Sequence, residues 1–293
     1  MLDVQHLTKR FGDRTVLDDV TFTVRDGVLT GFVGANGAGK TTTMRCILGV
    51  VRPDAGEALL GGHPIGISDR ARFGYMPEER GLYPKMKVHE QLVYFAELHG
   101  LDRATATRNT DALLEELGLA ERRGDLVEAL SLGNQQRAQI AAALVHDPEV
   151  LILDEPFSGL DPIAVETVLG VLQRYAARGI PVLYSSHQLD VVERLSDELV
   201  IISGGVVKIA GNRRALQEEH SRGLHRIVVA DDAGWLRDEP GVEVLDFDRG
   251  TALFRTTDEQ AAQRVLHNAL ARGPVEAFGP NLVKLSEIYR EVI

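Results

Sequence analysis

The stretch VLTGFVGANGAGKTTTMRCILGVV, residues 28–51, joins three different local patterns. It begins with an apolar run that is typical of a buried strand and then passes through a loop with three glycines. The segment that follows has the apolar spacing of a helix, which we expect to continue until shortly before Pro53. A strand, a glycine-rich loop and a helix in this order indicate an α/β fold that binds phosphate.

The loop GANGAGKT, residues 34–41, matches the pattern G-x-x-x-x-G-K-[ST] at every fixed position. Its glycines let the backbone approach an anion closely, and the start of the next helix adds the positive end of a dipole. We expect Lys40 to contact the β- and γ-phosphates and Thr41 to offer its hydroxyl to Mg²⁺. The residues predicted to hold the nucleotide in this P-loop are Gly34, Ala35, Asn36, Gly37, Ala38, Gly39, Lys40, Thr41 and Thr42.

A second apolar run, EVLILDE at residues 149–155, ends in two carboxylates. Asp154, at the end of a buried strand, is suited to hold Mg²⁺ through water, and Glu155 is suited to polarise an attacking water. Adjacent carboxylates at a strand end also occur as caps of turns or helices. Because the chain contains a P-loop, the metal-binding and catalytic roles are favoured here.

The first 220 residues contain three further regions around these two motifs. Two alternating apolar runs near the N-terminus, VQHL and VLDDVTFTV, predict antiparallel strands. Residues from about 85 to 145 have helical spacing in three segments, which predicts an inserted helical subdomain. EVLILDE and IPVLYSSH are too continuously apolar for a solvated face, so we expect a parallel sheet covered on both sides, with a helix at residues 163–179 between these strands.

The pattern changes after about residue 220. Three short runs with strand character are followed by a helical segment at residues 258–273, another short strand and a terminal amphipathic helix at residues 281–293. We therefore expect two domains, a catalytic one at residues 1–220 and a small α+β accessory domain at residues 221–293. The second has no cluster of catalytic side chains, which favours a regulatory, dimer-stabilising or packing role.

Composition limits the possible partners and the compartment. Of the 293 residues, 43 are acidic and 32 basic, giving a net charge of −11, which does not favour nucleic acid as a partner. The single cysteine, Cys46, excludes an intramolecular disulfide, fits a reducing compartment and lies among apolar neighbours that predict burial. The chain shows neither a signal peptide nor an apolar run long enough to span a membrane, so we expect a cytoplasmic protein.

Five motifs in fixed order, GANGAGKT, LSLGNQQR, LILDE, SGLD and SSH, resemble the ATP-binding subunit of an ATP-binding cassette (ABC) transporter over residues 1–220. The resemblance implies a head-to-tail dimer, in which the P-loop of one cassette and the signature loop of the other enclose the same Mg·ATP. LSLGN stands where LSGGQ is common in the family. The signature residues implied to contact the partner's nucleotide are Ser131, Leu132, Gly133 and Asn134.

Further site residues follow from the resemblance. Phe11 matches the aromatic that stacks on adenine, and Val16 is expected to line the same pocket. Asp161, in SGLD, matches a residue at the dimer seam, although it is also suited to cap a helix before Pro162. His187 matches the switch histidine that contacts the γ-phosphate and orients water or the catalytic Glu155.

At one position the residue differs from the family's usual residue and changes the predicted set of Mg²⁺ ligands. Glu78, in FGYMPEERGLYP, stands where the family usually has glutamine. An amide oxygen and a carboxylate can both ligate Mg²⁺, but the carboxylate adds negative charge beside Asp154 and Glu155. We expect Glu78 to be a metal-site residue that makes Mg²⁺ binding tighter or more sensitive to pH.

The resemblance implies an ATPase that drives export through a separate multi-span membrane permease, held at the inner face of the plasma membrane by that permease. The segment GYMPEERGLYPKMKV, the altered signature and the C-terminal region are similar to bacterial type-2 exporters of the sodium-extrusion and drug-resistance kind. The two cassettes form a homodimer or a pair of different chains. Sodium, drugs, lipids and peptides all stay open as cargo, because the permease carries the substrate path. The alternatives are an ABC ATPase that acts on the ribosome or nucleic acid, and a regulatory subunit that closes without transport.

Overall fold

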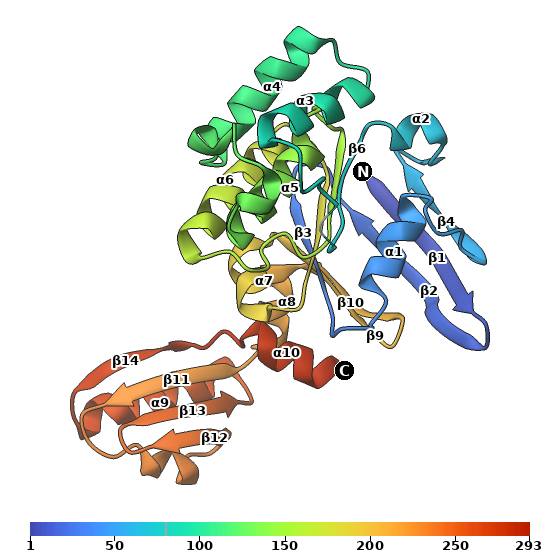
Figure 1. Ribbon diagram of the computed structural model, residues 1–293. Helices are drawn as coiled ribbons and strands as arrows, with labels where there is room; N and C mark the ends of the chain where they lie inside the picture. The colour runs from blue at the N-terminus through green and yellow to red at the C-terminus, as the bar shows by residue number, and fades with distance from the viewer. Residues whose placement is uncertain (80) are drawn as a thin grey trace. The chain divides into compact units, whose positions relative to one another are not determined.

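The computed structural model describes residues 1–79 and 81–293. Within this part, the chain divides into two compact units, one formed by Met1–Arg213 with Val292–Ile293 and the other by Arg214–Glu291. The first unit contains two sheets and the second contains one (Figure 1). We describe each unit by itself.

An antiparallel sheet in the order β2-β1-β4-β5 opens the first unit. The predicted antiparallel strands are confirmed, because Leu2 to Phe11 pair with Arg14 to Val24 across the turn at Gly12. The four strands are β1 (Leu2–Phe11), β2 (Arg14–Val24), β4 (Ala55–Leu60) and β5 (His63–Pro64). This sheet therefore brings the predicted aromatic Phe11 to the end of the β1–β2 hairpin.

A second sheet of the first unit, in the order β10-β9-β3-β8-β7-β6, is parallel except for β10. Every residue of β3, β7 and β8 is buried, as expected for strands covered on both faces. The strands are β3 (Leu29–Val33), β6 (Phe73–Met76), β7 (Val150–Leu153), β8 (Val182–Ser186), β9 (Glu198–Ser203) and β10 (Val206–Asn212). Because β3, β7 and β8 are parallel neighbours, the P-loop, the Asp154–Glu155 pair and His187 follow their strands at one edge of the sheet.

Helix α1 (Lys40–Ile47) lies between the two sheets (Figure 1), and its buried residues share one core cluster with both of them. Cys46 is 4% exposed, which confirms its predicted burial. The helix ends at Ile47, so our expectation that it would continue toward Pro53 is wrong. Gly49 has φ 72°, a left-handed conformation that stops the helix and that glycine adopts without steric cost.

The three predicted helices of the insert are confirmed. Asp102 caps α4 by accepting hydrogen bonds from the amides of Ala104 and Thr105, and Ser131 caps α5. The insert contains α3 (Val88–Leu98), α4 (Arg103–Glu116), η1 (Ala120–Arg122), η2 (Val127–Ala129) and α5 (Leu132–Leu144). The unit also contains α2 (Ile67–Arg70), α6 (Pro162–Ala177), which connects β7 to β8, and α7 (Leu189–Leu195).

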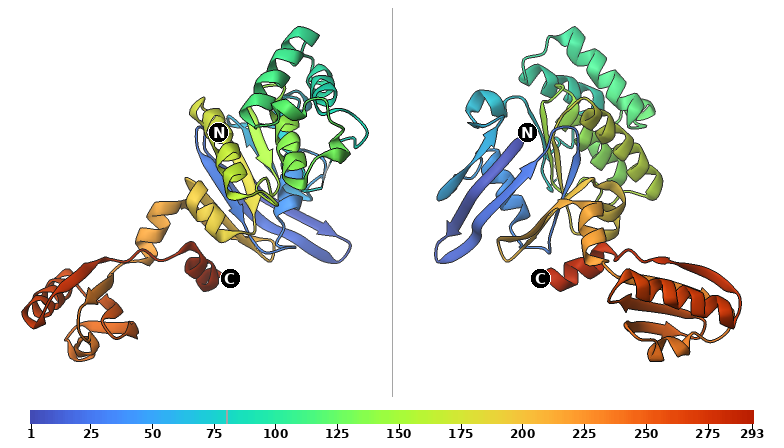
Figure 2. Two further views of the ribbon diagram at one scale, coloured as in Figure 1. Left: turned by 60° about the vertical axis from the view of Figure 1, so that its left-hand side comes forward. Right: turned by 180° about the vertical axis from the view of Figure 1, so that it is seen from behind.

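The second unit has an antiparallel sheet in the order β12-β13-β11-β14. In this split arrangement β11 lies between β13 and β14, which follow one another in the sequence. Helix α9 covers one face of it (Figure 2), where Val265 and Ala269 pack with Ile227 and Phe254. The strands are β11 (Leu224–Val229), β12 (Val242–Asp248), β13 (Thr251–Thr256) and β14 (Val275–Pro280). The other elements of the C-terminal region are α8 (Arg213–His220), η3 (Gly234–Asp238), α9 (Glu259–Arg272) and α10 (Leu285–Val292).

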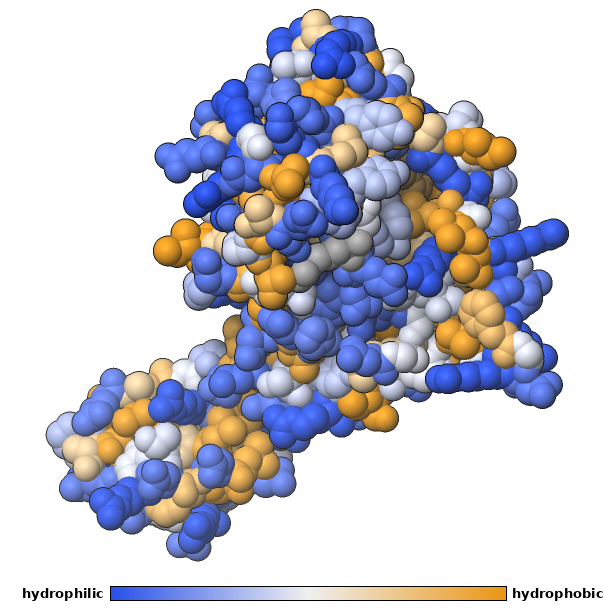
Figure 3. Space-filling model, in the orientation of Figure 1, coloured by the Kyte–Doolittle hydropathy of each residue, from blue (hydrophilic) through white to orange (hydrophobic). Residues whose placement is uncertain are grey.

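Within residues 1–79 and 81–293, the helices are all too short or too polar to cross a membrane. On the face seen in Figure 3, hydrophilic side chains predominate and apolar ones occur in small groups.

Candidate nucleotide-binding site

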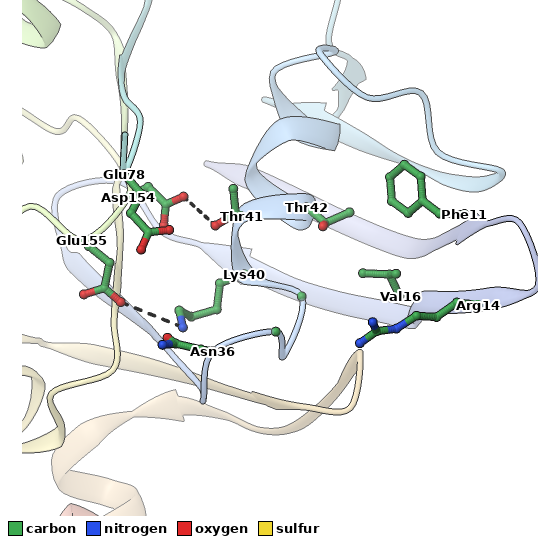
Figure 4. A pocket seen from close by; sticks show the side chains of 12 residues that line it. Phe11, Arg14, Val16, Asn36, Lys40, Thr41, Thr42, Glu78, Asp154 and Glu155 are labelled. Atoms are coloured by element: carbon green, nitrogen blue, oxygen red, sulfur yellow. Dashed lines mark hydrogen bonds and ion pairs between the residues drawn. The ribbon is translucent and has the colours of Figure 1, made fainter. Parts of the chain in front are cut away.

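A cavity of about 540 Å³ opens where the P-loop, the carboxyl end of β7 and the β1–β2 hairpin meet (Figure 4). Its volume is in the range of small-molecule sites. The cavity is lined by Phe11, Arg14, Val16, Asn36, Gly37, Gly39, Lys40, Thr41, Thr42, Glu78, Asp154 and Glu155. Residues that are far apart in the sequence, from the hairpin, the P-loop, the Glu78 loop and the end of β7, therefore form one site.

The P-loop is packed tightly against protein atoms on one side and is open on the other. A Cβ atom at Gly34 would lie 2.5 Å from the carbonyl oxygen of Ile202, and one at Gly39 would lie 2.7 Å from a methyl of Leu17. At Gly37, by contrast, a Cβ atom would meet nothing within 4 Å. In the described part of the chain, no side chain caps the start of α1, so the first amides of this helix have no side-chain acceptor from a cap. This geometry fits a bound anion such as a nucleotide phosphate.

The ammonium group of Lys40 lies in the same loop and is largely buried, with 7% of the side chain exposed. It donates hydrogen bonds to the carbonyl oxygens of Gly34 at 2.6 Å and Ala35 at 3.4 Å. Its Nζ atom is 3.9 Å from Oε1 of Glu155. A buried ammonium is stabilised by an anionic partner, so this group suits the charge of a phosphate.

Side-chain oxygen atoms suited to ligate a metal ion lie together beside the start of α1. The hydroxyl of Thr41 donates to Oδ2 of Asp154 at 2.7 Å, and the hydroxyl of Ser185 donates to Oδ1. Asp154 is fully buried, and Glu78 lines the same cavity. Hydroxyl and carboxylate oxygens are the ligands that Mg²⁺ prefers, directly or through water, so Thr41, Glu78 and Asp154 fit this ion.

Glu155 is held in an unusual backbone conformation, with φ 53°. Its amide donates to the hydroxyl of Ser185 at 2.8 Å, and its side chain is 8% exposed. Oε1 of Glu155 lies 2.9 Å from Nδ1 of His187, which is itself about half exposed. Left-handed conformations of residues other than glycine are strained and cluster at functional sites. The carboxylate therefore has a fixed direction and a titratable neighbour.

The hairpin supplies the apolar end of the cavity. Phe11 is 50% exposed, so its ring is not a core side chain and has a free face for stacking. Val16 lies nearby on β2, and the ammonium of Lys9 is 5.3 Å from the centre of the Phe11 ring. An aromatic ring and a branched apolar side chain form a surface suited to a planar base.

The signature residues do not line this cavity in the described part of the chain. Ser131 and Leu132 are exposed at the start of α5, where the Ser131 hydroxyl accepts a hydrogen bond from the Asn134 amide at 3.4 Å. Gly133 lies beside the SGLD turn, since its Cβ position would be 3.6 Å from the carbonyl oxygen of Gly159. Asp161 caps α6 by accepting a hydrogen bond from the Ala164 amide at 2.9 Å. These residues form a second exposed surface of the same unit.

Two residues of the site were not predicted from the sequence. Arg14 lines the cavity and extends from β2 toward the P-loop (Figure 4), on the same strand face as Val16. Ser185 bonds both Asp154 and the amide of Glu155. The two-residue spacing of Arg14 and Val16, and the polar end of the strand VLYSS, are signals that would have identified them.

Two family models match the chain. One, described as ABC transporter, matches residues 17–158, and the other, described as the C-terminal domain of DrrA1-3-like ATP-binding proteins, matches residues 211–293.

Similar proteins and structures carry related names. The chain is 35% identical over 293 residues to an uncharacterized ABC transporter ATP-binding protein, YhaQ, of Bacillus subtilis (strain 168), covering 100% of this chain and 98% of that one. It is 41% identical over 208 residues to the Nod factor export ATP-binding protein I of Ralstonia nicotianae, covering 70% and 65%. It is 36% identical over 219 residues to the linearmycin resistance ATP-binding protein LnrL of Bacillus subtilis, covering 74% and 70%. A solved structure described as the ATP binding subunit of an ABC transporter superposes with a TM-score of 0.69 at 34% identity, covering 75% of this chain and 93% of that one.

Proposed function

The chain belongs to the family of ABC transporter ATP-binding proteins, and on this premise we propose how its residues hydrolyse ATP to drive export through a separate membrane permease. As a member of this family it is an ATPase, works with a membrane permease and pairs as a dimer. The names of its relatives favour transport over action on the ribosome or nucleic acid.

One observation carries the proposed chemistry: Lys40, Asp154 and Glu155 converge on one cavity, and His187 is bonded to Glu155. The P-loop amides and Lys40 hold the phosphates of ATP, with adenine against Phe11. Thr41, Asp154 and Glu78 would hold Mg²⁺, which neutralises charge on the phosphates.

Glu155 acts as the general base toward the attacking water. Its carboxylate is the one at the cavity whose direction is set by both a strained backbone and a side-chain partner. The proton moves from the water to Oε1 or Oε2 of Glu155, while His187 orients this carboxylate through Nδ1 and positions the water. Lys40 stabilises the charge that develops on the transferring phosphoryl group.

A head-to-tail homodimer completes the site. The signature residues Ser131 to Asn134 lie outside the cavity of their own chain and expose a serine hydroxyl at the start of α5. This surface is suited to contact the γ-phosphate bound by the P-loop of a second copy, with Asp161 at the seam. ATP then closes the dimer, and hydrolysis removes the bridging phosphate and releases it.

The helical insert and the loop from Glu78 to Tyr83 carry this movement to the permease; within that loop Arg80 lies outside the described residues. Tyr83 and Tyr94 are 53% and 41% exposed and line an open, largely apolar hollow. Exposed aromatic side chains around a hollow are suited to bind a partner. We place the subunit at the inner face of the plasma membrane, where this contact with the permease occurs.

We assign the catalytic role to residues 1–220 and an accessory role to residues 221–293. The proposed export follows the names of two relatives, which concern Nod factor export and linearmycin resistance. The cargo of this chain is determined by its permease.

The test is the variant Glu155→Gln in the full chain. It should bind ATP, accumulate as a closed dimer in size-exclusion chromatography with Mg·ATP, and hydrolyse ATP about 100-fold more slowly, the range lost with one acid–base group. Glu166→Gln, an exposed carboxylate on α6 that forms an ion pair with Arg194, is the matched control and should hydrolyse ATP normally. Normal turnover of Glu155→Gln would refute the assignment of the base.

A further inference from the structure

Gln136 connects the signature helix to the backbone of the catalytic carboxylate. It lies on α5, is 6% exposed, and its side-chain amide donates to the carbonyl oxygens of Glu155 at 3.0 Å and Pro156 at 3.1 Å. A single amide group therefore donates to two buried carbonyls of the turn that follows β7, of which that of Glu155 also accepts from the amide of Ser158 at 3.1 Å. Buried carbonyls without a donor are unfavourable, so this contact stabilises one arrangement of the turn.

The turn needs such support because the backbone of Glu155 is strained. Its φ of 53° is left-handed, and this conformation persists only where the surroundings hold it. Contacts on both sides along the chain hold Glu155. Its amide donates to the hydroxyl of Ser185 of β8, and its carbonyl accepts from Gln136 of α5 and from the amide of Ser158, the latter at 3.1 Å. The backbone conformation sets the direction of the side chain, whose Oε1 meets His187.

The same helix carries the signature residues at its start. Ser131 caps α5, so Gln136 lies less than two helical turns further along one hydrogen-bonded element. One turn beyond Gln136, the amide of Gln139 donates to the carbonyls of Pro77 at 2.7 Å and Glu79 at 3.1 Å, on both sides of Glu78. A displacement of α5 therefore acts on the backbone at Glu155 and next to Glu78.

We propose that Gln136 is a positioning residue, through which contact of the signature loop with the partner's nucleotide sets the direction of this chain's own Glu155. Each chain then contacts the nucleotide of one shared ATP site through Ser131. Through Gln136 it positions its own Glu155, which is the catalytic base of the other ATP site. This inference rests on the proposed function, because it requires Glu155 to be the base and Ser131 to face a second copy. It adds a physical connection between the two ATP sites of the dimer.

The experiment compares Gln136→Met with Gln217→Met in the full chain. Gln217 lies on α8, is 4% exposed, and its amide donates to the carbonyl of Val283 at 3.0 Å. Methionine keeps the length of the side chain and removes the donor in both variants. The two variants therefore differ mainly in whether the lost hydrogen bonds held the turn at Glu155.

We expect Gln136→Met to lower kcat about tenfold or more with KM for ATP changed less than about threefold, because a misdirected base slows chemistry without weakening phosphate binding. Gln217→Met should keep kcat within about twofold of the unchanged chain at saturating ATP. Thermal unfolding and binding of a fluorescent ATP analogue establish that both variants are folded and bind nucleotide. If Gln136→Met does not fold, Gln136→Asn is measured instead, because it keeps a donor on a shorter side chain. Its kcat should lie between that of the unchanged chain and a tenfold loss.

A double-mutant cycle separates positioning of Glu155 from a general structural role. In a Glu155→Gln background, adding Gln136→Met should lower the residual rate by less than about twofold, because the residue on which Gln136 acts is already disabled. A full tenfold further loss in that background, or a kcat of Gln136→Met within twofold of the unchanged chain, overturns the proposal. A normal rate for Glu155→Gln alone would instead overturn the proposed function, so the two failures are distinguishable.

Discussion

Nδ1 of His187 lies 2.9 Å from Oε1 of Glu155, and the two residues come from the ends of neighbouring parallel strands, β8 and β7. Glu155 is almost completely buried, whereas His187 is about half exposed. The histidine therefore connects the buried carboxylate to the surface on which a partner subunit would close. It is placed to orient Glu155 and to contact a group that binds at that surface.

The first prediction concerns this pair. His187→Ala should lower kcat about 100-fold while ATP binding changes little, because the variant loses a group that orients the base and not one that holds phosphate. Steady-state ATP hydrolysis and binding of a fluorescent ATP analogue measure the two effects. His63→Ala, an exposed histidine next to β4, is the control and should hydrolyse ATP normally. Equal losses of binding and turnover in His187→Ala would contradict an orienting role.

The second prediction tests the shared site. Lys40→Ala and Ser131→Arg copies should each be nearly inactive alone, because each disables both sites of its homodimer. In a head-to-tail mixed dimer, both defects fall in one site, and the other site keeps an intact Lys40 and an intact Ser131. Mixing the two inactive proteins should therefore restore measurable ATP hydrolysis. The rate should stay below half of the normal rate per mixed dimer, because the chain with Ser131→Arg supplies Glu155 of the intact site but has lost the signature contact proposed to position that carboxylate. Titration of one variant against the other, with the rate measured at each ratio, tests this; no recovery at any ratio would argue against the shared site.

The local parts of the fold and the site were predictable from the sequence. The P-loop is recognisable because its glycines and Lys40 act through the backbone geometry of a few consecutive residues, and Gly37, Gly39 and Lys40 line one cavity. The parallel core was predictable because β7 and β8 are continuously apolar, as strands covered on both faces must be.

Contacts made across the chain were not predictable. Gln136 reaches the turn at Glu155 only because α5 packs beside the end of β7, and the same helix also carries Gln135 and Gln139. Arg14 faces the cavity because of the register between β1 and β2, which includes several irregularities. The end of α1 depended on Gly49 adopting a left-handed conformation, while the apolar spacing of the segment continued beyond it. In each case the local sequence allowed several conformations or contacts, and tertiary packing or the backbone conformation selected one of them.

The third prediction concerns Glu78, the carboxylate of the proposed metal site that stands where the family usually has glutamine. Glu78→Gln should raise the Mg²⁺ concentration needed for half-maximal ATP hydrolysis several-fold, because the cavity loses one negative charge beside Asp154. Activity at saturating Mg²⁺ should change less. Glu79→Gln, the adjacent carboxylate, is the control, since Glu79 does not line the cavity among its described residues. An unchanged Mg²⁺ dependence of Glu78→Gln would show that Glu78 is not a metal ligand.

The fourth prediction concerns the stability of the first unit in acid. The rings of His146 and His99 are stacked with centres 3.6 Å apart, and burial, reinforced by the charge of His99, lowers the pKa of His146 to about 4. An unfolded chain binds a proton at this side chain near pH 6.5, so between pH 6.5 and 4 the unfolded state holds more protons than the folded state. The contribution of neutral His146 to stability is therefore complete above about pH 6.5 and is lost as the pH falls toward 4.

His146→Gln should remove part of this dependence. Glutamine does not titrate and keeps an amide donor for the carbonyl of Phe73, which lies 3.1 Å from Nε2 of His146. Between pH 6.5 and 4, the free energy of unfolding of the unchanged chain should fall more steeply than that of the variant, by on the order of 2 kcal/mol. Denaturant unfolding at a series of pH values measures both slopes. Parallel curves for His146→Gln and the unchanged chain would show that burial of His146 does not govern the acid response.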